Sequence, residues 1–434
     1  MNARFDPSGP LRGSLRVPAD KSISHRAAIV AAMASEPVRV RNYLDAADTR
    51  STLAAVQKLG AIVESRADGL LIRGCGLRNA LPQHGAIDVG NAGTLMRLLP
   101  GWLAFQPGQS FELDGDDSIR RRPVDRIAEP LSLMGARIEA REGRFPPFTV
   151  HGAALRGIEY ELPVASAQVK SCVLLAGLGA RGDTVVREHV LTRRHTEELL
   201  ARCGADVTEE GGDGADHVVR LGPSELAPFE LDVPGDPSQA AFWIVAACVV
   251  PGSEVTVEHV YVGRGRRGYL DVLARMGAAI VEVPTTGPGD LDATADVTAR
   301  YGPLRGTVVE ASEITGLDEV PVLAVAGACA SGDTVFRAVG ELRVKESDRL
   351  AGVAELVRVF GAGAEVDGDD LVVHGTGRLV PAAVDARGDH RMAMAAAVAG
   401  LAAGSDPTKI AGWGAVATSY PGFATDLVAL SGTR

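Results

Sequence analysis

The sequence predicts a two-domain α/β protein built from six βαβαββ repeats, three in each domain. Three observations lead to this fold. The chain has 434 residues, which is too many for one ordinary hydrophobic core. An apolar segment with a helix-capping residue in front of it occurs six times. A glycine that can end a second, amphipathic helix follows each of these segments.

The first helix of each repeat is recognisable from its cap and its apolar run. "VPADKSISHRAAIVAAMAS" from Val17 and "VPGDPSQAAFWIVAACVV" from Val233 show the plan. These helices are apolar nearly all round, so we expect them in the interior. Their N-termini should share one face, which would attract anions. The candidate N-caps are Asp20, Asn91, Ser166, Asp236, Asp318 and Asp389.

The second helix of each repeat has one polar face and should lie outside. A short β-like run such as "EPVRVRNY" precedes it, and a strand–turn–strand such as "AIVESRADGLLIRG" usually follows. The glycines that should end these helices are Gly60, Gly135, Gly204, Gly277, Gly361 and Gly432.

The last repeat indicates a discontinuous domain. It ends at Gly432 without its hairpin, whereas the chain begins with the strand-like "LRGSLRV". We therefore expect residues 1–17 and 234–434 to form one domain and residues 18–233 an inserted one, with the active site in the cleft between them.

Composition narrows the class of protein. The net charge of −11 argues against a general nucleic-acid or anionic-membrane binder. The five cysteines form no CxxC pair and suit the core of a reduced protein. No early apolar run reaches the length of a membrane span, so we expect a cytoplasmic protein.

Polar residues gather where the interior helices begin. "DKSISHRA" places Lys21, Ser22 and Arg26 at a helix start, where cations are unfavourable unless an anion binds. "GNAGT" (90–94) is a small-residue loop that lets backbone N–H groups approach a phosphate or carboxylate. A plain turn and a solvated, capped helix remain the alternatives.

Three further motifs are candidates for anion contacts, with ordinary solvated charge as the alternative. "GDDSIRRRPVDR" (115–126) contains Arg122, and "GDHRMAMAAA" opens an apolar helix. In "ELRVKESDRL" (341–350), Lys345 and Arg349 share a face if the stretch is helical. Asp318 in "GLDEVPVLAVAGACA" is by itself only a helix cap.

"GRGRRG" (263–268) matches the dinucleotide fingerprint, with Glu282 at a suitable spacing. The other repeats lack the pattern at this junction, so it is weak support for a nicotinamide site. No sequence motif suggests a metal site.

Taken together, the motifs resemble the enolpyruvyl transferases. "DKSISHRA", "GNAGTLMR", "RRRP", "LRVKESDRL", "DHRMAMA" and "SYPGF" stand in that family's order along the chain. The resemblance implies a two-domain inside-out α/β barrel and closure over the substrates. It is strongest to the branch that transfers the carboxyvinyl group of phosphoenolpyruvate to the 5-hydroxyl of 3-phosphoshikimate and releases phosphate. It also implies no metal, no organic cofactor and a monomer.

The resemblance also implies roles for individual residues. Asp318 would be the base for the hydroxyl group, Lys21 the proton donor or relay, and Glu346 an assisting group. The matches to phosphoenolpyruvate contacts are Lys21, Gly93, Arg122, Gln168, Arg349 and Arg391. The matches to 3-phosphoshikimate contacts are Lys21, Ser22, Arg26, Ser166, Gln168, Asp318 and Lys345.

Several positions depart from the family pattern. Ala167 stands where many members have a second serine, Leu98 where many have proline, and Gly414 where many have lysine. Two alternatives stay open. One is the sister enzyme that acts on UDP-N-acetylglucosamine, which typically has a cysteine in the loop matching 115–123; this chain has none there. The other is a non-catalytic repeat protein that binds phosphorylated ligands.

Overall fold

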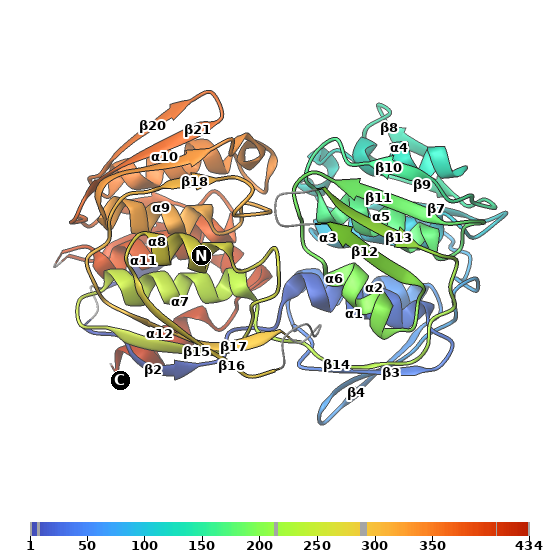
Figure 1. Cartoon of the computed structure of the whole chain (residues 1–434), viewed down its shortest axis with the longest axis horizontal. Helices are drawn as coiled ribbons and strands as arrows, with labels where there is room; N and C mark the ends of the chain where they lie inside the picture. The colour runs from blue at the N-terminus through green and yellow to red at the C-terminus, as the bar shows by residue number, and fades with distance from the viewer. Residues whose placement is uncertain (1, 7–8, 212–215, 287–292, 405, 433–434) are drawn as a thin grey trace. The chain divides into compact units, whose positions relative to one another are not determined.

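The computed structural model describes residues 2–6, 9–211, 216–286, 293–404 and 406–432. The chain forms two compact units (Figure 1). Unit 1 contains Met1–Pro18 and Pro234–Arg434, and unit 2 contains Ala19–Val233. In the described part of the chain, each unit has three sheets, and its helices form an inner and an outer set.

The sheets of unit 2 repeat one topology. Their strand orders are β14-β3-β5-β4, β6-β7-β9-β8 and β10-β11-β13-β12. The first two strands of each order are parallel and the remaining pairs are antiparallel. The strands are β3 (Pro37–Arg41), β4 (Ile62–Arg66), β5 (Gly69–Arg73), β6 (Ile87–Asp88), β7 (Ser110–Asp114), β8 (Arg137–Arg141), β9 (Phe145–His151), β10 (Glu159–Glu161), β11 (Thr184–Glu188), β12 (Val207–Gly211), β13 (His217–Leu221) and β14 (Glu230–Asp232).

The sheets of unit 1 use both N-terminal strands. β2 (Arg12–Leu15) pairs in parallel with β15, and β1 (Asn2–Phe5) pairs antiparallel with β23, where other repeats have a hairpin strand. The strand orders are β16-β17-β15-β2, β18-β19-β21-β20 and β1-β23-β22. The other strands are β15 (Glu254–Tyr261), β16 (Ala279–Pro284), β17 (Thr294–Arg300), β18 (Val308–Glu310), β19 (Ser331–Arg337), β20 (Gly363–Asp367), β21 (Asp370–Thr376), β22 (Ala383–Asp385) and β23 (Thr408–Ala411).

The predicted interior helices are buried. All residues of α7 are buried, and α7, α9 and α11 pack on one another in the middle of unit 1 (Figure 1). The inner helices are α1 (Lys21–Met33), α3 (Gly93–Leu103), α5 (Ala167–Gly177), α7 (Pro237–Val249), α9 (Val320–Cys329) and α11 (His390–Ala402). The prediction of an α/β fold with apolar inner helices is confirmed.

The outer helices expose one face, as their patterns predict. They are α2 (Ala47–Lys58), α4 (Asp125–Met134), α6 (His195–Arg202), α8 (Gly268–Arg275), α10 (Arg349–Val359) and α12 (Phe423–Ser431). Short 3₁₀ helices are η1 (Ile119–Arg121), η2 (Gly340–Val344) and η3 (Trp413–Thr418). All six predicted terminating glycines have positive φ, from 64° at Gly432 to 113° at Gly135. Glycine adopts this conformation without the steric cost of a Cβ atom.

Four of the six predicted caps are correct. The side chains of Asp20, Ser166, Asp236 and Asp389 each accept a backbone N–H of the helix that follows. The prediction is wrong at Asn91, because α3 begins after Ala92 and Asn91 donates to Asp116 instead. It is also wrong at Asp318, because Glu319 occupies the cap position of α9 and Asp318 pairs with arginines.

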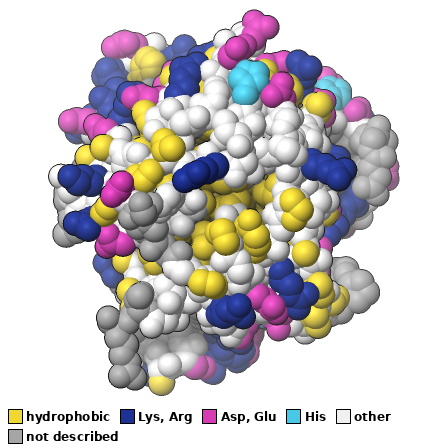
Figure 2. All heavy atoms as spheres, turned by 90° about the vertical axis from the view of Figure 1, so that its left-hand side faces the viewer, with side chains coloured by type: hydrophobic (Ala, Val, Ile, Leu, Met, Phe, Trp, Pro, Cys, Tyr) yellow, Lys and Arg dark blue, Asp and Glu magenta, His cyan; other side chains and the backbone are white. Residues whose placement is uncertain are grey.

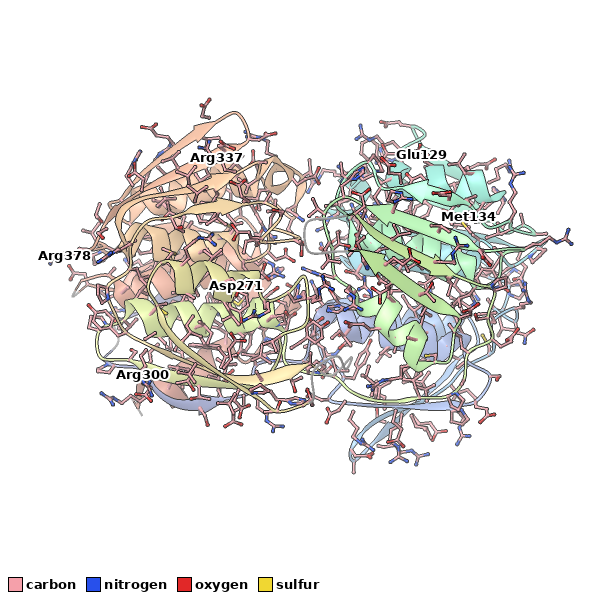
Figure 3. All side chains as sticks on the ribbon, in the orientation of Figure 1. Glu129, Met134, Asp271, Arg300, Arg337 and Arg378 are labelled. Atoms are coloured by element: carbon pink, nitrogen blue, oxygen red, sulfur yellow. The ribbon has the colours of Figure 1, made fainter. Side chains whose placement is uncertain are left out.

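Charged side chains lie on the outside of unit 1. Arg300 and Arg337, on strands of two sheets, point outward and pair with Glu254 and Asp370 (Figure 3). Figure 2 shows one face of the molecule, on which hydrophobic side chains lie among charged and polar ones. Among the described residues, no helix has both the length and the hydropathy of a membrane span.

The "SYPGF" motif anchors the C-terminal helix in an aromatic cluster. Trp243 stacks on Phe423 with ring centroids 4.5 Å apart. Tyr420 is buried, accepts a hydrogen bond from Nε1 of Trp243 at 2.8 Å and donates one to Asp426 at 2.6 Å. The motif therefore joins α7 to the start of α12.

We expect Tyr420→Phe to lower the free energy of unfolding by about 1–3 kcal/mol, because it leaves a buried indole N–H and a carboxylate without the hydroxyl between them. Urea unfolding measures the change. Tyr301→Phe is the matched control, since Tyr301 is 48% exposed, and it should change the free energy by less than about 0.5 kcal/mol. Equal effects from both substitutions would contradict this role for the Tyr420 hydroxyl.

Helix α1 buries a histidine beside charged residues. The Nδ1 atom of His25 lies 2.6 Å from Oγ1 of Thr52 on α2. Burial lowers the pKa of His25 to about 3; the charge of Asp48 opposes this shift, whereas Lys21 and Arg26 add to it. His25 is therefore neutral in the folded protein at neutral pH.

We expect His25 to make the protein acid-labile. Because its pKa is lower in the folded than in the unfolded state, its contribution to stability is present above about pH 6.5 and is lost as the pH falls towards 3. Between pH 7 and pH 5 this loss is about 2 kcal/mol of unfolding free energy. His25→Asn should flatten the measured dependence by that amount, whereas His84→Asn, at an exposed histidine, should leave it unchanged. An unchanged slope in His25→Asn would exclude His25 as the cause.

Candidate active site

In unit 2, the start of α1 holds the predicted basic residues. Asp20 caps the helix through Ile23 N at 2.8 Å. Lys21 Nζ lies 3.0 Å from Oδ2 of Asp48, which α2 supplies. Ser22 Oγ accepts a hydrogen bond from Nη1 of Arg193 at 2.8 Å. Lys21 and Ser22 therefore lie side by side at a helix N-terminus, each oriented by a charged residue from another helix or loop.

Arg26 ties α1 to two neighbouring helices. Its Nε donates to Oγ1 of Thr196 on α6 and its Nη2 donates to Oγ of Ser171 on α5, both at 2.8 Å. Its Nη1 donates to the backbone oxygen of Ser22 at 3.1 Å. Arg26 is buried, so hydroxyl and carbonyl groups fix the direction of its guanidinium.

Gln168 joins the starts of α3 and α5. Its Oε1 accepts from Nη1 of Arg97 at 2.7 Å, and its Nε2 donates to Oγ1 of Thr94 at 3.2 Å. Ser166, two residues earlier, caps α5. The N-termini of α3 and α5 therefore lie at the same end of unit 2, as the repeat predicts.

Gly93 and Arg122 form a close pair in the same unit. A Cβ atom at Gly93 would lie 2.7 Å from Nη1 of Arg122, so a larger residue would displace the guanidinium. Arg122 also donates to Asn91 and Ser118. The small-residue loop therefore lets an arginine approach the backbone at the start of α3.

Behind these groups lies a buried ionic cluster. Lys170 Nζ lies 2.6 Å from a carboxylate oxygen of both Glu188 and Glu197. His217 Nδ1 lies 2.8 Å from Glu188. The possible ligand atoms of Glu188, Glu197 and His217 lie close enough together for a metal ion. However, the Lys170 ammonium already contacts both carboxylates. The cluster therefore suits a structural ion-pair network.

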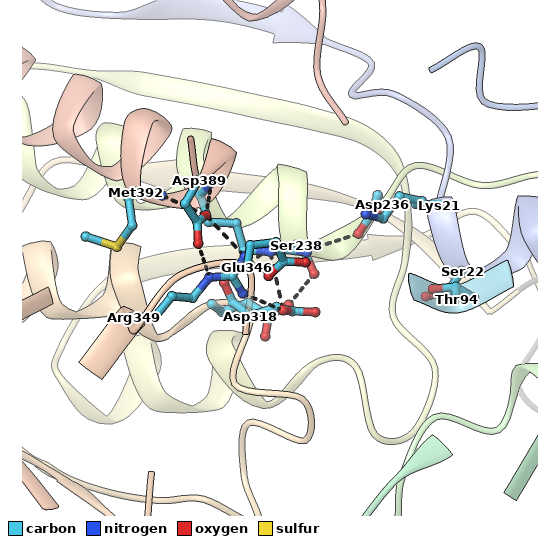
Figure 4. A network of polar contacts seen from close by, with 12 residues as sticks. Lys21, Ser22, Thr94, Asp236, Ser238, Asp318, Glu346, Arg349, Asp389 and Met392 are labelled. Atoms are coloured by element: carbon cyan, nitrogen blue, oxygen red, sulfur yellow. Dashed lines mark hydrogen bonds and ion pairs between the residues drawn. The ribbon is translucent and has the colours of Figure 1, made fainter. Parts of the chain in front are cut away.

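In unit 1, Arg349 is the centre of the predicted site. It is fully buried, and its guanidinium lies 2.8 Å from Asp389, 3.2 Å from Asp318 and 2.6 Å from Glu346 (Figure 4). Burial by itself would lower the pKa of Arg349, but the charges of Asp389, Glu346 and Asp318 outweigh it and raise the pKa above its usual range. The structure therefore brings these predicted residues together around one permanent cation.

Asp318 lies between two arginines. Its Oδ1 is 3.2 Å from Nη1 of Arg349 and 3.3 Å from Nε of Arg391. The preceding residue, Leu317, has a left-handed backbone with φ of 58°, which is rare for a leucine. The Asp318 side chain keeps 17% of its surface exposed, so the carboxylate is held in position and can still be reached.

Lys345 and Arg349 do not share a helical face, so this prediction is wrong. Asp348 accepts from Ala351 N and caps α10, which therefore begins at Arg349. Lys345 follows η2 with an extended backbone. The two cations thus approach the site from different segments, and the intervening turn brings Glu346 to Arg349.

Asp389 has two functions. Its Oδ1 accepts from the backbone N–H of Arg391 at 2.9 Å, and its Oδ2 accepts from Nε of Arg349 at 2.8 Å. Burial raises and Arg349 lowers the pKa of Asp389, and the net shift is downward. Asp389 therefore holds both arginines that contact Asp318.

The sequence interpretation missed two contributors. Asp48 pairs with Lys21 and Arg193 donates to Ser22, but each lies in a charged stretch that looks like solvated surface. The one available signal was position, because Asp48 opens the outer helix of its repeat and Arg193 precedes another.

The two sets of residues suit different chemistry. Unit 2 offers Lys21, Arg26 and Arg122 with helix N-termini, an arrangement that binds oxyanions. Unit 1 offers carboxylates held by guanidinium groups, an arrangement that suits proton transfer beside an anion.

Comparisons with known proteins agree with these motifs. The family model for EPSP synthase (3-phosphoshikimate 1-carboxyvinyltransferase) matches residues 5–427. A 3-phosphoshikimate 1-carboxyvinyltransferase of Thermus thermophilus is 47% identical over 98% of both chains, and one of Synechococcus sp. is 45% identical over 97% of both.

Solved structures agree as well. The EPSP synthase of Acinetobacter baumannii aligns over 99% of this chain and 97% of its own, with a TM-score of 0.84 and 36% identity. The enolpyruvyl transferase NikO of Streptomyces tendae shares the fold at a TM-score of 0.76 and 21% identity, over 98% of this chain and 96% of its own. On these matches, which cover nearly the whole chain, the protein belongs to the EPSP synthase (3-phosphoshikimate 1-carboxyvinyltransferase) family.

Proposed function

We propose that this protein transfers the carboxyvinyl group of phosphoenolpyruvate to the 5-hydroxyl of 3-phosphoshikimate and releases inorganic phosphate. The observation that carries the proposal is the Asp318 carboxylate held between Arg349 and Arg391, in a chain that matches the family from end to end. This arrangement supplies a base and cations at the same place.

The reaction requires addition followed by elimination. The hydroxyl oxygen bonds to C2 of phosphoenolpyruvate while its proton leaves, and C3 gains a proton. The phosphate then leaves from C2, and C3 loses a proton to restore the double bond. One group must therefore accept the hydroxyl proton, and another must give and later take a proton at C3.

We assign these roles to residues of both units. Asp318 accepts the hydroxyl proton, and Lys21 gives or relays the proton to C3. Glu346 assists, because its contact with Arg349 places it near Asp318. Lys345 is assigned to 3-phosphoshikimate.

The anionic groups of the substrates need cations and hydrogen-bond donors. Arg122 and Arg391 can each bind an oxyanion through two parallel hydrogen bonds. We assign Arg349 to phosphoenolpyruvate as a nearby positive charge, because its guanidinium already contacts three carboxylates. Gly93 and Gln168 complete the phosphoenolpyruvate contacts, and Ser22, Arg26 and Ser166 complete those to 3-phosphoshikimate. The pairing of Arg26 with Thr196 and Ser171 keeps its guanidinium oriented for this purpose.

Phosphate release with defined acceptors tests the proposal. The protein should release phosphate from phosphoenolpyruvate when 3-phosphoshikimate is present. UDP-N-acetylglucosamine as acceptor should give none, whereas activity with it would favour the sister enzyme. Binding of both substrates without turnover would favour a non-catalytic binding protein.

We further propose that the protein acts as a monomer in the cytoplasm, without a metal or organic cofactor. Sedimentation with and without substrates tests the oligomeric state. Activity after exhaustive dialysis against a chelator tests the metal.

Asp318→Asn should lower turnover by about 10²-fold or more, because the amide cannot accept the hydroxyl proton. Ligand affinities should stay within about tenfold, since the amide keeps the shape of the side chain. Steady-state kinetics and calorimetry measure the two effects. Near-normal turnover would remove Asp318 from the mechanism.

Arg391→Ala should raise the Michaelis constant for phosphoenolpyruvate at least about tenfold, because a charge-assisted contact is lost. Lys409→Ala is the matched control. Lys409 is exposed on β23 between Arg4 and Ala383, and its loss should barely change that constant. A large effect from Lys409→Ala would show that this lysine replaces the family lysine missing at Gly414.

A further inference from the structure

The glycine–arginine turn "GRGRRG" (263–268) packs against the loop that carries Asp318. Oγ1 of Thr315 donates to the backbone oxygen of Gly265 at 2.6 Å. At Gly268 a Cβ atom would lie 1.8 Å from the backbone oxygen of Glu313, so only glycine fits there. The turn and the loop 313–319 are thus in direct contact within unit 1.

Arg266 carries this contact into the interior. Its side chain is buried, and its Nη2 lies 2.9 Å from Oδ1 of Asp236 and 3.2 Å from Oγ of Ser238. Ser238 in turn donates to Oε1 of Glu319 at 2.5 Å. A buried chain of polar contacts therefore runs from Arg266 through Ser238 to Glu319.

Glu319 is the residue after Asp318 and occupies the cap position of α9. On the other side of Asp318, Leu317 has the left-handed backbone described above. The backbone is therefore constrained on both sides of Asp318. A change in how firmly Glu319 is held should change the direction in which the Asp318 carboxylate points. Asp236 and Ser238, which receive Arg266, both lie at the start of α7 (Figure 4).

We infer that Arg266 is a positioning residue for the base Asp318, acting through Ser238 and Glu319. The inference rests on the proposed function, since it assumes that Asp318 accepts a proton from the substrate. The turn that matches a dinucleotide fingerprint by its letters would then serve to orient a catalytic carboxylate.

Charge explains why arginine suits this place. Asp236 and Glu319 are both buried. The guanidinium of Arg266 places a positive charge beside Asp236 and beside the Ser238 hydroxyl that binds Glu319. A buried carboxylate is costly without such compensation. Arg266→Met therefore risks general destabilisation, so a milder substitution must decide the question.

Ser238→Ala is that substitution, because it removes the hydroxyl that links Arg266 to Glu319 and keeps the Arg266–Asp236 pair. We expect it to lower kcat about tenfold or more, while the Michaelis constants of both substrates stay within about threefold. Arg266→Lys should retain more kcat than Arg266→Met. Arg267→Met is the matched control; Arg267 is the neighbouring residue, pairs with Glu282 and Asp271 on the surface, and should keep wild-type kinetics.

A double mutant separates positioning from a general structural effect. If Ser238 acts through Asp318, Ser238→Ala should cost little further kcat in an Asp318→Asn background. Full additivity of the two losses would overturn the inference. So would a Ser238→Ala loss in kcat well below tenfold, or one matched by equal changes in the Michaelis constants. A wild-type protein without phosphate release would instead refute the proposed function.

Discussion

The buried guanidinium of Arg349 is the interaction on which the candidate site of unit 1 depends. A charge removed from water is tolerated only with close counter-charges, and here three carboxylates surround it. Each carboxylate comes from a different segment: the loop before α9, the turn before α10 and the cap of α11. Pairing with one cation therefore fixes the relative positions of three segments. Asp389 extends this order to Arg391, because the same carboxylate also accepts the Arg391 backbone N–H.

Unit 2 reaches a comparable order by a different route. Near its inner-helix starts, hydroxyl and carbonyl groups orient Arg26, and Asp48 pairs with Lys21. Buried ion pairs lie close by, around Lys170. Because Ser171 follows Lys170 and Thr196 precedes Glu197, the ionic cluster supports the two hydroxyl groups that hold Arg26. The buried ion pairs around Lys170 thus help to fix the position of Arg26, which we assign to substrate binding.

The sequence predicted the repeat well because its signals are local. Burial of an inner helix follows from its apolar composition, and the positive φ of Gly60 and the other terminating glycines follows from helix geometry. The wrong predictions arose where tertiary contacts compete with local ones. Asp318 pairs with two arginines instead of capping α9. Helix α10 begins after its cap at Asp348, so Lys345 lies outside the helix and shares no face with Arg349. Asp48 and Arg193 were missed because their partners lie far away in sequence, which composition and spacing do not reveal.

The "GRGRRG" turn shows how one pattern of letters can serve two kinds of structure. In a dinucleotide site, glycines let a pyrophosphate approach the backbone. Here Gly268 lets the backbone oxygen of Glu313 approach, so the same absence of a Cβ atom accommodates another loop of the protein. The arginine that would attract a phosphate in solution is instead buried against Asp236. What distinguishes the two cases is the partner of the charge, and in this fold that partner lies at the start of the adjacent inner helix. The repeat therefore determines the structural role of this motif, because it determines which helix start lies beside the turn.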